Sequence, residues 1–170
     1  YLKVKYINNP KRLGYAQNLL KSIKLSSGNY VMILMDDDEI ILNNFHNIFK
    51  VIDSKNDYAI ISSADSNQKL FNKSKLSELQ IIDSIGECRH ASGLIIRKKL
   101  ALEAINYKPL LESINISPHY PQIYICLFIL CKYKMFKFNL AIIQHFFDQA
   151  GQSEWSPEKL HSKFYSLQSR

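Results

Sequence analysis

Two spacings of apolar residues alternate along the chain. From Gly14 to Leu25 apolar residues recur every three or four positions, which predicts an amphipathic helix. Short apolar runs bounded by turn residues, such as 30–35, predict buried strands. Along the whole chain, the two patterns predict strands at 1–7, 30–35, 58–62, 94–96 and 137–146, helices at 14–25, 45–52, 98–105, 120–131 and 156–167, and loops at 63–75 and 147–155.

This alternation of strands and helices favours an α/β fold, in which helices cover the faces of a sheet. The chain has 170 residues, which is long enough for one domain with its own core, so we expect 1–170 to be a single domain. Its longest apolar run covers the nine residues 123–131, whereas a membrane span needs about 20.

Four acidic residues follow the predicted strand 30–35: Asp36, Asp37, Asp38 and Glu39. In α/β sheets ligands bind beyond the carboxyl ends of strands, so this cluster is a candidate site. Neighbouring carboxylates repel each other unless water or a cation offsets their charge, and their oxygens are preferred ligands of Mg²⁺ and Mn²⁺. The cluster predicts either a divalent-cation site or a solvated acidic turn that caps the next helix.

Basic residues outnumber acidic ones by 22 to 15, which gives a formal charge of +7. This excess predicts an anionic partner, and a nucleic acid, a phosphorylated small molecule and an anionic membrane surface all fit it. The basic residues are scattered and match no nucleic-acid-binding motif, so we expect no nucleic acid. Cys88, Cys126 and Cys131 form no CxxC motif, which predicts reduced core thiols in a cytoplasmic protein.

A set of short motifs follows a fixed order over some 35 residues. In that order they are Asn8 or Asn9 after the first strand, Leu13–Gly14, Asn18, Gly28–Asn29–Tyr30, and Asp36 to Asp38. The segment resembles the family 2 inverting glycosyltransferases, which have the GT-A fold. It is most similar to members that transfer deoxysugars or similar sugars onto bacterial surface polysaccharides of the O-antigen or capsule type. The resemblance implies a mixed sheet flanked by helices and a nucleotide-sugar donor.

The resemblance also implies roles for the acidic cluster. Asp36 would face the ribose or the sugar of the donor, and Asp37 would bind a divalent cation, Mn²⁺ or Mg²⁺, on its diphosphate. Asp38 would assist either function. Many family members carry an Asp where this chain has Met35, which leaves open which carboxylate is the metal ligand. His145 matches a histidine of the family that joins the metal or the diphosphate.

Further donor-binding residues are implied more weakly by the second half of the chain. Residues 89–100 resemble the family segment that leads to the acceptor side, where a small-residue turn would let the backbone approach a sugar closely. The alternative to donor binding is a position in a solvated loop for Arg89 and His90, and simple packing against neighbouring residues for Trp155. Outside the acidic cluster, the donor-binding candidates are Asn18, Arg89, His90, Ser92, Gly93, Gln122 and Trp155.

The catalytic base has no acidic candidate where the family usually keeps one. No Asp or Glu lies between Glu112 and Asp148, so the base is His119, Glu112 or another carboxylate, or is absent. A histidine suits the role of general base because the pKa of an imidazole group in general lies near neutrality. The alternative for His119 is hydrogen bonding at the start of a helix.

These features predict an inverting transfer of a sugar to a glycan or lipid-linked glycan in the cytoplasm, at the inner face of the membrane. An anionic membrane surface there would suit the charge of +7. The rival classes are a non-catalytic glycan- or nucleotide-binding remnant of the fold and a basic nucleic-acid-binding module. Because 1–9 resembles the third strand of the family domain, we expect the chain to be its carboxyl-terminal two-thirds and to self-associate.

Overall fold

The computed structural model describes residues 4–36, 38–53, 58–63, 78–133, 135–138 and 141–145, which form a mixed α/β fold. A four-stranded sheet has the order β1 (Tyr30–Met32), β4 (Ile95–Arg97), β3 (Ile60–Ser63) and β5 (Met135–Phe138). The β1–β4 and β3–β4 pairs are antiparallel and the β3–β5 pair is parallel. A second, two-stranded sheet pairs β2 (Asp38–Ile40) with β6 (Ile143–His145).

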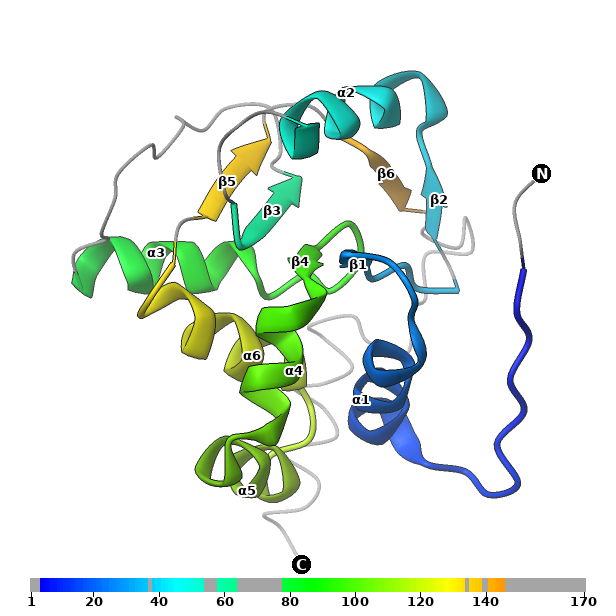
Figure 1. The fold of residues 1–170 in the computed structure, drawn as a ribbon, viewed down its shortest axis with the longest axis vertical. Coiled ribbons are helices and arrows are strands. Elements are labelled where there is room, and N and C mark those ends of the chain that lie inside the picture. Colours follow the sequence, from blue (N-terminus) through cyan, green and yellow to red (C-terminus); the bar gives the residue numbers. More distant parts are fainter. Residues whose placement is uncertain are drawn as a thin grey trace, which may run out of the picture.

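Helices cover both sides of the four-stranded sheet (Figure 1). They are α1 (Gly14–Leu25), α2 (Leu42–Asp53), α3 (Glu78–Glu87), α4 (Lys98–Asn106), α5 (Lys108–Ile116) and α6 (Pro121–Leu130). In Figure 1, α2 lies above the strands beside β2 and β6, and α1, α4, α5 and α6 lie below them. Both α5 and α6 carry a proline at their start, where its missing N–H removes no intrahelical bond.

The alternation of side chains along the strands produces two separate apolar cores. Ile60 and Ile96, which pair across β3 and β4, face the core made with α1, α4, α5 and α6. Their neighbours Ile61 and Ile95 face the opposite core, made with α2 and β6. All four are at most 2% exposed, and burying each contributes about 1.5–3 kcal/mol. The sheet is therefore the middle layer of three.

The apolar run that begins at Ile123 forms most of α6, which packs against α3, α4 and α5. A helix that is apolar all round belongs in a core, and Ile125, Cys126 and Ile129 are fully buried. Within the described ranges no helix combines the length and apolarity that a membrane crossing requires.

Four helices confirm the predictions from apolar spacing: α1, α2, α4 and α6. The strand predicted at 1–7 is wrong over residues 4–7, which form no strand and leave Val4 and Tyr6 almost fully exposed. Alternation gives a strand only where a neighbour satisfies its backbone, and among the described residues β1 pairs with β4 alone. The described residues of the predicted strand 137–146 belong to two strands, β5 and β6, or lie just before β6, and the predicted strand 30–35 is regular only to Met32.

Two helices, α3 and α5, were not predicted. In α5 the buried residues Leu110 and Ile114 lie four positions apart. Two apolar residues at this spacing are too few to distinguish a helix from a loop in the sequence. The predicted helix 156–167, the loop 147–155 and most of the loop 63–75 lie outside the described residues. Cys88 and Cys126 are buried free thiols as predicted, whereas Cys131 is exposed.

Candidate functional site

The described residues of the acidic segment, which is residues 36–39, belong to a turn and to a strand rather than to a single turn. Asp36 is exposed in the turn after β1, and Asp38 and Glu39 begin β2. The N–H of Asp38 donates to the carbonyl oxygen of Met35 at 3.4 Å. Asp37 lies outside the described residues. The acidic residues therefore connect the carboxyl end of β1 to the second sheet.

Strand pairing brings two of the three predicted metal ligands to opposite positions. In the antiparallel β2–β6 pair, Asp38 is the direct Cα partner of His145, although 107 positions separate them in the chain. Carboxylate oxygen and imidazole nitrogen are donors that Mn²⁺ accepts, so the residue types fit such a cation. The described side chains include no group of three potential ligands, and those of Asp37 and His145 are not among them. The metal site stays a prediction.

The turn at Ser92 and Gly93 holds the backbone that leads to the acidic segment. The N–H of Met35 donates to Ser92 Oγ at 3.2 Å, and the N–H of Gly93 donates to the carbonyl of Ile33 at 2.9 Å. Ile33 in turn donates to the carbonyl of Leu94 at 3.0 Å. Ser92 is only 8% exposed. These two donor-binding candidates thus lie beside the acidic segment, where they extend the β1–β4 pairing past the regular strand.

The glycine at position 93 is required by its backbone conformation. Its φ is +80°, in the left-handed region that residues with a Cβ rarely adopt. This conformation turns the chain so that the amide of Gly93 and the hydroxyl of Ser92 both reach the segment 33–35. In this structure the turn contacts the chain's own backbone at residues 33–35, and the predicted close approach to a sugar stays a prediction.

Gln122 is a buried link between three parts of the chain. Its side chain is in the first turn of α6 and is 2% exposed. Nε2 donates to the carbonyl oxygen of Arg89 at 2.9 Å, and Oε1 accepts from the hydroxyl of Tyr15 at 3.1 Å. Burial raises the pKa of Tyr15 to about 12. Because it is buried, Gln122 presents almost no surface to a sugar, and in this structure it holds the backbone at Arg89.

Three other predicted donor-binding residues are at the surface. Arg89 and His90 are exposed after α3, and Asn18 is exposed on α1. The Oδ1 of Asn18 accepts a hydrogen bond from Asn9 Nδ2 at 2.6 Å, and Asn9 Oδ1 accepts from Lys21 at 2.6 Å. Two asparagines of the motif series are therefore joined. Trp155 lies outside the described residues.

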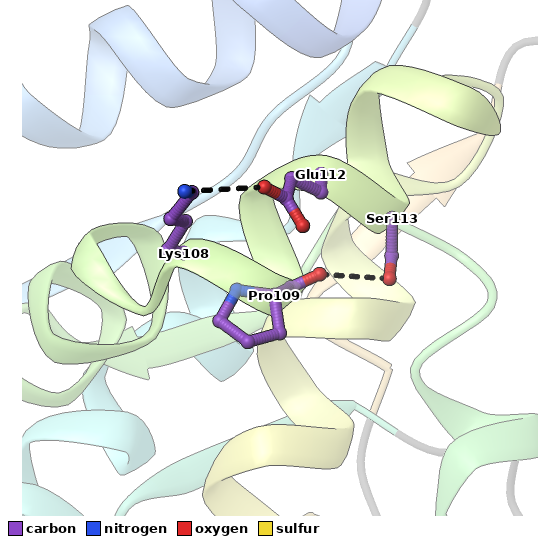
Figure 2. A network of polar contacts seen from close by, with 4 residues as sticks. All are labelled: Lys108, Pro109, Glu112 and Ser113. Carbon is purple, nitrogen blue, oxygen red and sulfur yellow. Dashed lines mark hydrogen bonds and ion pairs between the residues drawn. The ribbon is translucent and has the colours of Figure 1, made fainter.

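The two candidate bases occupy different environments. His119 is exposed just before α6 and lines a cavity of about 380 Å³ together with Gly14 and Tyr15 at the start of α1. Glu112 is 61% exposed on α5 and forms an ion pair with Lys108 at 3.8 Å, one helical turn away (Figure 2). The described lining of the His119 cavity contains neither Glu112 nor a residue of the acidic segment. Among the described residues, His119 thus lines a space that could hold a substrate, whereas Glu112 is in a surface ion pair.

A larger cavity, of about 620 Å³, was not predicted from the sequence. It lies at the amino end of β1 and is lined by Tyr30 and by the consecutive cations Arg97, Lys98 and Lys99. The signal for it in the sequence is the run Arg97–Lys98–Lys99 at a junction of strand and helix.

Comparison with known families adds an independent observation. The sequence model of the family described as Glycosyl transferase family 2 matches residues 1–110. No curated protein and no solved structure matches the chain. The matched range contains the acidic segment and the Ser92–Gly93 turn, and it ends before both candidate bases and His145.

Proposed function

The chain belongs to glycosyltransferase family 2, and on this premise we propose that it transfers a sugar from a nucleotide-sugar to a glycan or lipid-linked glycan with inversion. We further propose a GT-A-like domain that acts in the synthesis of a bacterial surface polysaccharide. The observation that carries the proposal is the acidic segment after β1, inside the range matched by the family and held by Ser92 and Gly93.

On the donor side of the proposed site, Asp36 faces the ribose or the sugar. The metal ligands are Asp37, Asp38 and His145. These residues would hold a divalent cation, which when bound would neutralise the charge that develops on the leaving diphosphate. The Ser92–Gly93 turn keeps the backbone of residues 33–35 in place, so the carboxylates need little reorganisation when the donor binds.

On the acceptor side, His119 is the proposed general base. An acceptor hydroxyl attacks the anomeric carbon from the face opposite the nucleotide while the imidazole takes its proton. The bond to the diphosphate breaks in the same step, which inverts the anomeric centre. Positioning of the two substrates supplies much of the acceleration. His119 is favoured over Glu112 because it lines a cavity, whereas Glu112 is in a surface ion pair.

For the acceptor we propose a lipid-linked glycan at the inner face of the cytoplasmic membrane. The formal charge of +7 supports this choice, because anionic lipids attract a basic protein to their surface. The protein would then be cytoplasmic and bind the membrane peripherally.

A panel of nucleotide-sugars tests the proposal. Free nucleotide released in the presence of an acceptor extract is measured with Mn²⁺ and with EDTA. Asp36→Asn and Asp38→Asn should each lower turnover by about a hundredfold or more, since both carboxylates act on the donor. Asp53→Asn, at the exposed end of α2, is the matched control and should keep full turnover.

Two results would contradict the proposal. Equal turnover in Asp38→Asn and Asp53→Asn would remove the acidic segment from the site. Binding of a nucleotide-sugar with no turnover under any condition would identify a binding protein on this fold. The configuration of the product at its anomeric carbon, read by NMR, decides between inversion and retention.

A further inference from the structure

The larger cavity lies at the opposite end of β1 from the acidic segment. Tyr30, the first residue of β1, lines it, whereas the acidic segment follows the last residue of that strand. Arg97 is the direct partner of Tyr30 in the antiparallel β1–β4 pair and lines the same cavity. We call this space, of about 620 Å³, the basic cavity. It is separate from the site proposed above.

The charged residues in the described lining of the basic cavity all carry the same sign. Arg97, Lys98 and Lys99 line it, and no Asp or Glu is among its lining residues in the described part of the chain. Like charges this close repel each other, and walls of low dielectric strengthen the field inside a cavity. The field there favours an anion.

Two of the three cations are held in place before any ligand arrives. Arg97 donates to the Tyr30 hydroxyl at 2.9 Å and lies over the Tyr30 ring, 5.4 Å from its centre. The Tyr30 hydroxyl donates to the carbonyl of Tyr58 at 3.0 Å. The Lys98 ammonium donates to the carbonyl of Ser26. An anion therefore meets a preformed arrangement, which lowers the entropic cost of binding.

The start of α4 adds to the positive field. This helix begins at Lys98, has no acidic residue in its first turn and no side-chain cap. Helix amino ends carry a partial positive charge, so cations there are unfavourable for stability. Three consecutive cations, Arg97 to Lys99, occupy this end. Their repulsion would be relieved by an anion bound in the basic cavity.

We propose that the basic cavity binds a phosphate-bearing anion. Guanidinium and ammonium groups are the common donors to phosphate oxygens. The phosphate would come from a free diphosphate or from the headgroup of an anionic lipid. Both sources present the same oxygens, and the experiment below separates them.

The test uses the whole chain and two charge reversals. Lys99→Glu changes an exposed lysine of the basic cavity, whereas Lys11→Glu makes the same change at an exposed lysine outside it. Inorganic pyrophosphate is titrated by calorimetry in the presence of EDTA. In parallel, the proteins are sedimented with vesicles of phosphatidylcholine with and without phosphatidylglycerol. Because no nucleotide-sugar or metal is present, the result is independent of the proposed transferase activity.

We expect Lys99→Glu to weaken the binding of pyrophosphate, of phosphatidylglycerol vesicles or of both by about tenfold or more, and Lys11→Glu to change it less than about twofold. Whichever probe shows this difference identifies the source of the phosphate. Lys99→Glu should melt no lower than the wild type, since a carboxylate at a helix start is favourable. An equal loss of binding in Lys99→Glu and Lys11→Glu would overturn the proposal, and so would a wild type that binds neither probe.

Discussion

The main-chain N–H of Met35 donates a hydrogen bond to the hydroxyl oxygen of Ser92 across 3.2 Å. The two residues are 57 positions apart, and the bond fixes the backbone immediately before Asp36. Ser92 is thus a positioning residue for the acidic segment, because its side chain contacts the backbone that carries the carboxylates.

Ser92→Ala removes the acceptor of the Met35 amide. We expect a loss of about 1 kcal/mol in the free energy of unfolding and a several-fold higher KM for the donor. Ser92→Thr keeps the hydroxyl and should restore most of the donor affinity. Ser113→Ala is the control, because its hydroxyl bonds only to the Pro109 carbonyl within α5, at 2.9 Å (Figure 2). A KM equal to that of the wild type in Ser92→Ala would exclude the positioning role.

The left-handed backbone at Gly93 gives a second prediction. Gly93→Ala should lower the free energy of unfolding by about 1–2 kcal/mol, since φ is +80° there. Gly86→Ala, in α3, meets no atom within 4 Å and has no positive φ, so it should be neutral or stabilising by up to about 1 kcal/mol. Urea denaturation measures both. If Gly93→Ala proved more stable than Gly86→Ala, a Cβ at position 93 would not strain the turn.

The partly buried hydroxyl of Tyr15 predicts a dependence of stability on alkaline pH. Its pKa is raised from 10.0 to about 12 by burial, so the folded state favours the neutral phenol. The stabilisation is complete below pH 10 and is lost as the pH rises toward 12. The free energy of unfolding should therefore fall more steeply in the wild type than in Tyr15→Phe over this range. Tyr6→Phe, at an 86% exposed position, should behave as the wild type.

Substitutions at each of the two candidate bases distinguish which one acts in catalysis. His119→Ala should lower kcat by about 10²–10⁴, since a general base contributes this much. Added imidazole should restore part of the rate. Glu112→Gln should leave kcat unchanged, because it breaks only a surface ion pair that is worth at most about 1 kcal/mol. A large loss in Glu112→Gln together with full activity in His119→Ala would exchange the two assignments.

Local patterns in the sequence were enough to predict the helices that bury one stripe of side chains. The spacing of Leu19, Leu20 and Ile23 predicted α1, and the structure buries these residues. Such periodicity depends only on neighbours along the chain, so it can be read without the fold. The motif order in 8–40 indicated the same family that the match over 1–110 shows.

Contacts between distant segments were decided by the tertiary structure alone. The sequence placed Asp38 after a strand, but only the register of β2 on β6 brings His145 opposite to it. Likewise, the cations after Arg97 became the wall of a cavity only when β4 paired with β1 and brought Tyr30 beside them. The physical reason is that strand order and register depend on which backbone groups and apolar faces are satisfied together across the whole domain, and no local pattern carries that information.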